Sequence, residues 1–206
     1  MVAKGIGEIL MRQGIMGGSF DPVHEGHVNL ACEIMVAASL DSIRFIPAAV
    51  PPHKRDSILA NSAHRVAMLE LAIEGKPGLS VDTRELQRGG TSYTVETIRE
   101  LLNEFPADEF FFIIGADSLG DLPKWYDIAE LSKMVVFLVA ARPGDDLASC
   151  STTAERIAGL QFEVISTTPM DISSSGIRTE LRGRDIVPDG LSPSVLSYIR
   201  EKGLYA

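Results

Sequence analysis

The chain has 206 residues, of which 45% are hydrophobic, and it carries a formal net charge of −9 at pH 7 with a pI near 4.9. This length predicts one domain around one sizeable core. The acidic balance argues against a nucleic-acid partner, because a broad nucleic-acid footprint needs a basic face. Cys32 and Cys150 stand far apart, which indicates neither a disulfide framework nor a zinc site.

The sequence carries no signal for export or membrane insertion. Lys4, Glu8 and Arg12 interrupt the apolar residues at the start, so a signal-peptide core is missing. The longest apolar run, MVVFLVAA at 134–141, is too short to cross a bilayer. We expect a cytoplasmic protein without a membrane partner, with residues 1–13 as an N-terminal extension and 14–206 as a single domain. The sequence does not decide whether the protein forms a homo-oligomer.

In chain order, short β-branched and aromatic segments alternate with longer amphipathic ones, a pattern typical of a parallel sheet wrapped by helices. The predicted strands are 13–17, 42–46, 79–82, 109–114, 134–140 and 162–165. Predicted helices cover 28–40, 63–75, 93–105 and 192–203. Ser92 or Thr91 is the expected cap of the third helix, and the fourth begins with Ser192 and Pro193 and ends at Gly203. The segments 48–61 and 142–153 are predicted loops that could act as mobile lids.

The stretch GIMGGSFDPVHEGH, residues 14–27, places glycines and two histidines where the first predicted strand ends. Gly17 and Gly18 let a ligand approach the backbone closely. His24 and His27 fall three residues apart around the first turn of the next helix, so their imidazoles can share one face. Because a helix N-terminus also attracts anions, this pattern indicates a polyphosphate site. On residue types alone, a tight turn with one capping and one packing histidine remains an alternative, and zinc is a weaker one.

The string GGSFDPVHEGH resembles the signature of the nucleotidylyltransferase superfamily, which is related to the HIGH motif of class I aminoacyl-tRNA synthetases. Further stretches narrow the resemblance: FIPAAVPPHK, VDTRELQRGGTSYTVETI, FFFIIGADSLGDLPKWY and ISSSGIR, in that order. Together they are similar to the bacterial nicotinate mononucleotide adenylyltransferases, which join ATP and nicotinate mononucleotide into deamido-NAD and pyrophosphate. The resemblance runs from about residue 14 to the C-terminus and implies a Rossmann-like, doubly wound α/β fold. ATP would bind between the first and fourth sheet strands.

The resemblance implies a role for each matching residue. His24, His27, Lys54 and Arg178 would act on the ATP phosphates as catalytic residues. The implied ATP-binding residues are Gly17, Gly18, Ser19, Phe20, His24, His27, Asp117, Ser173, Ser174 and Arg178. In-line transfer of this kind needs alignment and charge stabilisation more than a base, and imidazole, ammonium and guanidinium groups supply that charge. Mg²⁺ would be bound mainly through ATP phosphates, so no protein metal ligand is predicted.

The implied nicotinate mononucleotide-binding residues are Ser92, Tyr93, Thr94, Trp125 and Tyr126. In the family the pyridine ring stacks on the tryptophan matching Trp125, and the carboxylate meets backbone N–H groups and the threonine matching Thr94. A carboxylate gains more than a carboxamide at a helix start, so a preference for the acid follows if Thr94 begins a helix.

Several of these residues also have structural interpretations. Lys54 could be a solvated loop charge, Asp117 a helix cap, and Trp125 a packing residue. ISSSGIR could be an ordinary helix start with Arg178 on the surface. Rival functions are a phosphopantetheine adenylyltransferase, a non-catalytic nucleotide-binding module and an RNA-linked role. The first leaves Ser92–Thr94 and Trp125 without a role, and the last conflicts with the acidic charge.

Overall fold

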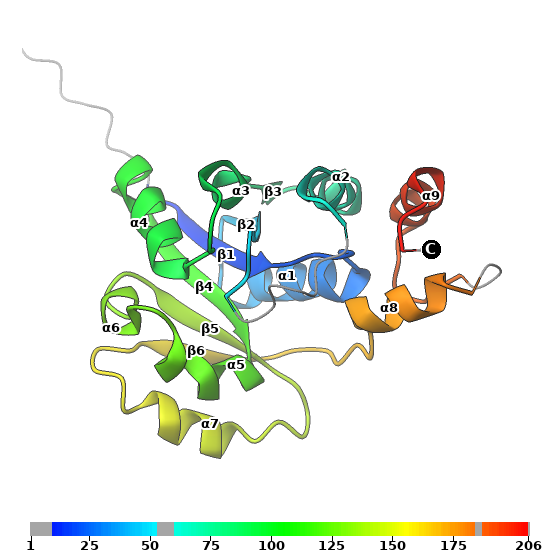
Figure 1. Cartoon of the computed structure of the whole chain (residues 1–206). Coiled ribbons are helices and arrows are strands. Elements are labelled where there is room, and N and C mark those ends of the chain that lie inside the picture. Colours follow the sequence, from blue (N-terminus) through cyan, green and yellow to red (C-terminus); the bar gives the residue numbers. More distant parts are fainter. Residues whose placement is uncertain (1–9, 53–59, 184–186, 206) are drawn as a thin grey trace, which may run out of the picture.

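The computed structural model of the chain describes residues 10–52, 60–183 and 187–205. The six predicted strands form one sheet in the order β3-β2-β1-β4-β5-β6, and all pairings are parallel. The strands are β1 (Arg12–Gly18), β2 (Ser42–Pro47), β3 (Leu79–Val81), β4 (Glu109–Gly115), β5 (Val136–Ala141) and β6 (Phe162–Ser166). The predicted Rossmann-like, doubly wound sheet is confirmed, and the strand order reverses between β1 and β4 (Figure 1).

Helices cover both faces of this sheet. One face carries α1 (Glu25–Ala37), α2 (Ser62–Ile73), α8 (Ser174–Leu181) and α9 (Pro193–Lys202). The other face carries α4 (Thr94–Glu104), α5 (Ala116–Asp121), α6 (Ile128–Leu131) and α7 (Leu147–Ala154), with α3 (Arg84–Arg88) and the 3₁₀ turn η1 (Leu122–Lys124) in connecting segments. Figure 1 shows α5, α6 and α7 grouped near β4, β5 and β6.

The side-chain alternation of the strands divides the buried core into two parts. In β4, Phe111 and Ile113 face the core under α1, α2, α8 and α9, whereas Phe110, Phe112 and Ile114 face the core under α4 to α7. A strand buried on both faces reads as a continuous apolar run, which is why the segment FFFII is uninterrupted.

The capping residues predicted from the sequence are correct for one helix and wrong for another. Helix α9 begins and ends as predicted: the Ser192 hydroxyl accepts a hydrogen bond from Val195 N, and Gly203 closes the helix in the left-handed region at φ 61°. The predicted cap of α4 is wrong. Tyr93 occupies the cap position, and its side chain makes no capping hydrogen bond. The Ser92 hydroxyl does not cap the helix, because it accepts from Ala49 N at 2.9 Å.

The predicted loop 142–153 is also partly wrong, because α7 occupies its second half. Its sequence of small and hydroxyl residues is a weak helix former in isolation. Packing of Leu147 and Ala154 on the α5 side of the core stabilises it instead. The other predicted loop, 48–61, lies partly outside the described residues, and neither lid is tested.

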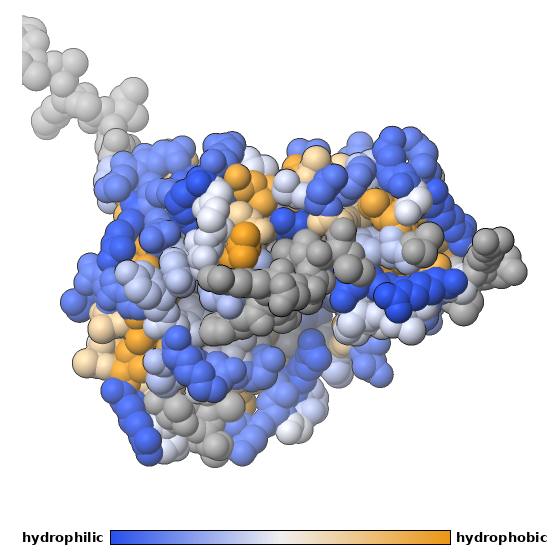
Figure 2. Space-filling view, viewed as in Figure 1, coloured by the Kyte–Doolittle hydropathy of each residue, from blue (hydrophilic) through white to orange (hydrophobic). Residues whose placement is uncertain are grey.

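Strand β1 begins at Arg12, one residue before the predicted start, since Arg12 N donates to the Asp41 carboxylate at 2.7 Å. The division into an extension over 1–13 and a domain over 14–206 stays a prediction. Within the described ranges, no helix is long and apolar enough to cross a membrane. The face seen in Figure 2 is mainly hydrophilic, with apolar residues in small separate groups.

Candidate active site

Two adjoining cavities open at the carboxyl ends of β1 and β4, where the strand order reverses. We call the first the aromatic cavity; it has a volume of about 680 Å³, and Tyr93, Phe112, Trp125 and Tyr126 are among its lining residues. The second, the histidine cavity, has a volume of about 900 Å³ and includes His24 in its lining. The residues that line both are Gly17, Gly18, Ser19, His27, Leu30 and Gly115. His27 is therefore the imidazole at the junction of the two cavities.

The two histidines lie together at the start of α1, as their spacing predicts. His24 occupies the N-cap position, and its ring centroid is 3.8 Å from that of His27. The backbone N–H of His24 donates to Nδ1 of His27 at 3.3 Å. Neutral His27 then carries its proton on Nε2, where it can serve as a donor. The structural and functional interpretations are therefore compatible: His27 organises the helix start and also lines both cavities.

Gly26 explains the spacing between the histidines. A Cβ atom at this position would lie 3.0 Å from Nδ1 of His24, so the glycine leaves room for the imidazole. Gly18 has a similar reason, because a Cβ there would lie 2.9 Å from the Phe20 ring. Both glycines permit close packing of rings in the loop between β1 and α1.

His24 is buried, with 8% of its surface exposed, and this environment favours its neutral form. Desolvation, and to a lesser degree the charge of Arg142, lowers the pKa of His24 from 6.5 to about 4. Among the described residues, its buried Nδ1 atom has no hydrogen bond of normal geometry, although the side chain faces the backbone N–H of His27 in a capping box. A buried polar atom of this kind is uncommon and indicates a position that a ligand or water can satisfy.

This shift predicts a pH dependence of folding stability. Between pH 6.5 and 4 the unfolded chain protonates His24 while the folded chain does not, so the free energy of unfolding falls as the pH decreases. The contribution is of the order of 3 kcal/mol. Urea unfolding at several pH values should show that His24→Asn loses much of this dependence.

His64→Asn is the matched control, because His64 lies on α2 and lines neither cavity. This variant keeps His24 and should lose stability over the same pH range as the wild type. An identical pH dependence in wild type and His24→Asn would show that His24 is not buried in its neutral form.

The ISSSGIR segment forms the start of α8 and lines the histidine cavity next to the start of α1. Ser173 is the N-cap, and its hydroxyl accepts from Gly176 N at 3.1 Å. The hydroxyl of Ser174 donates to the Pro22 carbonyl at 2.8 Å, and Nη1 of Arg178 donates to the Asp21 carbonyl at 2.6 Å. Ser173, Ser174 and Arg178 all line the cavity, so the structure brings them beside His24 and His27.

Asp117 follows β4 and also lines the histidine cavity. Its carboxylate accepts from Ser118 N at 2.9 Å, but Gly115 rather than Asp117 occupies the cap position of α5. Asp117 is exposed toward solvent, which suits contact with a polar ligand.

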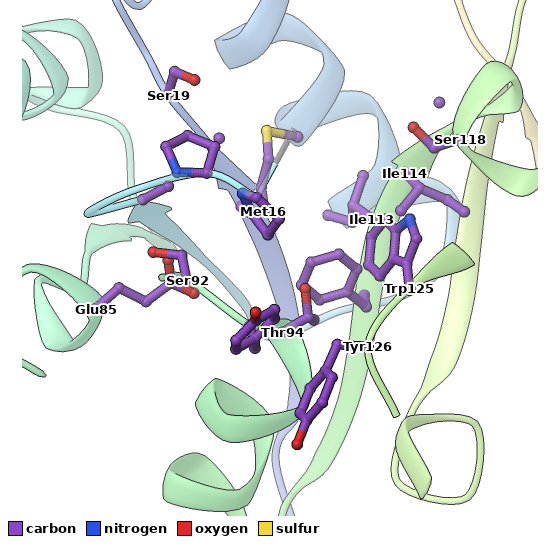
Figure 3. A pocket seen from close by; sticks show the side chains of 18 of the residues that line it. Met16, Ser19, Glu85, Ser92, Thr94, Ile113, Ile114, Ser118, Trp125 and Tyr126 are labelled. Carbon is purple, nitrogen blue, oxygen red and sulfur yellow. The ribbon is translucent and has the colours of Figure 1, made fainter. Parts of the chain in front are cut away.

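The predicted acceptor residues gather in the aromatic cavity. Thr94 is the first residue of α4, as the acid preference requires. The rings of Tyr93 and Tyr126 lie 4.5 Å apart, and Tyr126 is 58% exposed at the surface. Ser92 is buried on the other side, next to Glu85 (Figure 3).

Trp125 combines packing with a cavity wall. Its ring meets Phe112 edge-on at 5.8 Å and Phe137 at 6.4 Å, so it is anchored to the core under α4 to α7. The side chain is nevertheless half-buried and lines the aromatic cavity (Figure 3). Anchored aromatic rings are suitable platforms for a planar ligand ring. Lys54, the remaining predicted residue, lies outside the described residues.

Glu85 lines the aromatic cavity and was not predicted from the sequence. It is 8% exposed and accepts hydrogen bonds from the hydroxyls of Thr97, at 2.6 Å, and Ser92. Burial is the largest influence on this carboxyl and raises its pKa, whereas the two hydroxyls lower it. Because Arg88 donates to the Thr97 hydroxyl and Ala49 N donates to that of Ser92, both hydroxyl protons are directed to Glu85. Nothing in the local sequence signals this network.

We expect Glu85→Gln to destabilise this side of the cavity. Both hydroxyls donate their protons to Glu85, so the NH₂ group of a glutamine would place a second donor against one of them. The variant should therefore lose about 1–3 kcal/mol of unfolding free energy. Thermal unfolding tests this, with Glu70→Gln on the exposed side of α2 as control. A melting temperature for Glu85→Gln equal to that of Glu70→Gln would contradict the network.

Arg142 is a second residue that was not predicted. It lines the histidine cavity and lies close enough to His24 to lower its pKa. Its backbone N–H donates to the Asp145 carboxylate at 2.7 Å, which fixes the turn after β5. A signal was present in the sequence, since the segment ARPG follows the fifth strand at the sheet edge where ligands bind.

Comparison with known proteins defines the class. The pattern of the family described as cytidylyltransferase-like matches residues 15–180 of the chain. Among solved structures, nicotinic acid mononucleotide adenylyltransferase of Plasmodium falciparum complexed with NaAD has a TM-score of 0.77 at 20% identity, over 95% of this chain and 97% of that chain. The same Plasmodium falciparum enzyme complexed with APC has a TM-score of 0.76 at 19% identity, over 95% and 97%. At these identities the likeness supports the fold alone.

Sequence relatives are closer. The nicotinate-nucleotide adenylyltransferase of Bacillus subtilis strain 168 is 38% identical over 192 residues, covering 93% of this chain and 97% of the relative. The probable nicotinate-nucleotide adenylyltransferase of Geobacillus kaustophilus strain HTA426 is 43% identical over 196 residues, covering 93% and 85%. The chain therefore belongs to the nicotinate-nucleotide adenylyltransferase family within the cytidylyltransferase-like proteins.

Proposed function

We propose that this protein transfers AMP from ATP to nicotinate mononucleotide, giving nicotinate adenine dinucleotide and pyrophosphate. The observation that carries the proposal is the pair of adjoining cavities that share His27 at their junction. A transfer between two substrates needs two neighbouring sites whose reacting atoms meet, and this arrangement supplies them.

The histidine cavity is the proposed ATP site. Helix α1 presents its N-terminus and two imidazoles to this cavity, and Arg178 of α8 is also in its lining. Phosphate charge is favoured by the helix dipole and by these donors. Asp117 would accept from ribose hydroxyls, and the Gly17–Gly18 backbone permits close approach.

The aromatic cavity is the proposed site for nicotinate mononucleotide. Trp125 offers a ring surface, and Thr94 begins α4, a helix of 11 residues whose first N–H groups have no intrahelical partner. A carboxylate placed there accepts from these donors and interacts favourably with the helix dipole, while a neutral carboxamide gains less. The arrangement supports a preference for the acid over the amide.

The chemistry follows from these positions. A phosphate oxygen of the acceptor forms a bond to the α-phosphorus of ATP as the bond from that phosphorus to the bridging oxygen breaks, and pyrophosphate leaves with the electron pair. The nucleophile is already ionised near neutral pH, so no strong base is needed. His27, at the junction, would donate to the α-phosphoryl oxygens, and Arg178 would stabilise charge on the departing phosphates.

Mg²⁺ is the proposed cofactor. Mg²⁺ favours phosphate oxygens and water as ligands, so the ion would be held mainly by the ATP phosphates. When bound, the ion neutralises phosphate charge, and the residues named above orient the phosphates.

The proposal places the reaction in the cytoplasm, where ATP is available.

Incubation of the purified protein with ATP, Mg²⁺ and nicotinate mononucleotide tests the proposal. We expect a product with the mass of nicotinate adenine dinucleotide and one pyrophosphate for each dinucleotide. Binding of ATP without any dinucleotide would contradict the proposed reaction and favour a non-catalytic binding module.

A further inference from the structure

The end of the chain returns to the loop between β1 and α1. After α9 closes at Gly203, the hydroxyl of Tyr205 donates to Oδ1 of Asp21 at 2.7 Å, across 184 positions of sequence. Asp21 is 2% exposed and belongs to the GGSFDPVHEGH segment. The penultimate residue of the chain is therefore bonded to the segment that carries both histidines.

Asp21 is a central contact of this loop. Its Oδ1 also accepts from Ala60 N at 3.1 Å, just before α2. The charge of Asp21 is the first influence that offsets the desolvation of Arg65, a side chain with only 2% of its surface exposed. Arg65 in turn donates to the carbonyls of Ser19, at 2.7 Å, and Ala48, at 2.8 Å. This cluster fixes the backbone after β1 relative to the backbone after β2.

The same residue orients the guanidinium of the proposed ATP site. Nη1 of Arg178 donates to the backbone carbonyl of Asp21 at 2.6 Å. Tyr205 therefore fixes the side chain of Asp21, and the backbone carbonyl of Asp21 fixes Arg178. Displacement of Asp21 would move Arg178 and the loop that leads to His24.

We propose that Tyr205 is a positioning residue for ATP binding: its hydroxyl holds Asp21, and through Asp21 it sets the position of Arg178 and of the loop at 19–22. The inference rests on the proposed function, in which this loop and Arg178 bind ATP. Tyr205 itself lines neither cavity, and its hydrogen bond to Asp21 is the contact through which it would act.

Two further observations agree with this role. Tyr205 adopts the left-handed region at φ 66°, which is unfavourable for a bulky residue. The hydrogen bond to Asp21 is one contact that stabilises this conformation. Burial, followed by the bond to Asp21, raises the pKa of the Tyr205 hydroxyl, so the group stays protonated and remains a donor.

The test compares Tyr205→Phe with Tyr198→Phe, which makes the same chemical change on α9. The Tyr198 hydroxyl bonds Nδ1 of His64 at 2.9 Å, away from both cavities. We expect Tyr205→Phe to weaken Mg²⁺–ATP binding by about tenfold in calorimetry, and Tyr198→Phe by less than about twofold. In turnover, the KM for ATP should rise in Tyr205→Phe while the KM for nicotinate mononucleotide stays close to the wild-type value.

A purely structural role would lower the melting temperature of Tyr205→Phe without changing its affinity for ATP, and that result would overturn the inference. So would equal affinities in the two tyrosine variants. If Tyr205→Phe folds poorly, Asp21→Asn provides the second measurement, and an unchanged ATP affinity in this variant would also overturn the inference. Where both single variants fold, their effects on ATP affinity should not add in the double variant, and additive effects would overturn the inference as well. Since ATP affinity is measured without turnover, a wild type that binds ATP but forms no dinucleotide would contradict the proposed function alone.

Discussion

Replacing His27 by alanine should reduce turnover by about 10²–10³-fold, the cost of removing one preorganised donor to a developing phosphoryl charge. His27 is the imidazole that lines both cavities, so it can contact the phosphorus centre that passes from one substrate to the other. The backbone N–H of His24 donates to its Nδ1, so the neutral imidazole carries its proton on Nε2, the atom that we expect to act on the substrate. Steady-state kinetics with both substrates saturating measures this effect on kcat.

Two companion variants separate chemistry from folding. His27→Asn offers an oxygen that can replace Nδ1 at the helix start but does not reach as far as Nε2, so it should fold well and still lose about 10²-fold in turnover. His64→Ala removes a histidine that lines neither cavity and should keep near-wild-type turnover. Wild-type turnover in a folded His27→Ala variant would remove His27 from the mechanism.

Arg178→Ala should lower kcat/KM for ATP by about 10²-fold, because a charge-assisted and geometrically fixed phosphate contact is lost. The Asp21 carbonyl fixes one edge of the guanidinium, which leaves its other donors for the ligand. Arg178→Lys keeps the charge but loses the planar fork, so we expect only partial recovery.

Arg182→Ala is the matched control, since Arg182 is an exposed arginine at the end of the same helix and lines neither cavity. It should leave kcat/KM for ATP unchanged. Equal losses in the two alanine variants would indicate a general effect of charge near α8, and complete recovery by Arg178→Lys would show that the fork geometry is not used.

The sheet could be predicted from sequence because its signal is local. Each strand is an apolar run bounded by turn residues, and the run FFFII is buried on both faces. Helix α9 has its own cap residues at both ends. Helix α7 could not be predicted in this way, since its small residues favour a helix only when Leu147 and Ala154 find the core under α4 to α7.

In the candidate site too, the residues of one local motif could be predicted, whereas contacts between distant segments could not. His24 and His27 lie in one contiguous motif, so their spacing places them together at a helix start. The capping role expected for Ser92 was wrong because Ala49 N, which is distant in sequence, takes its hydroxyl oxygen. The contacts of Glu85 with Ser92 and of Asp21 with Tyr205 likewise depend on the tertiary structure.

Pyrophosphate release with ATP and Mg²⁺, measured in parallel for three acceptors, tests the account most directly. The acceptors are nicotinate mononucleotide, nicotinamide mononucleotide and phosphopantetheine. The positions of Thr94 at the start of α4 and of Trp125 in the aromatic cavity predict the highest kcat/KM for nicotinate mononucleotide, with the nicotinamide compound well below it and phosphopantetheine inactive. A higher kcat/KM for either of the other acceptors would contradict the proposed acceptor site, even if the histidine cavity binds ATP as described.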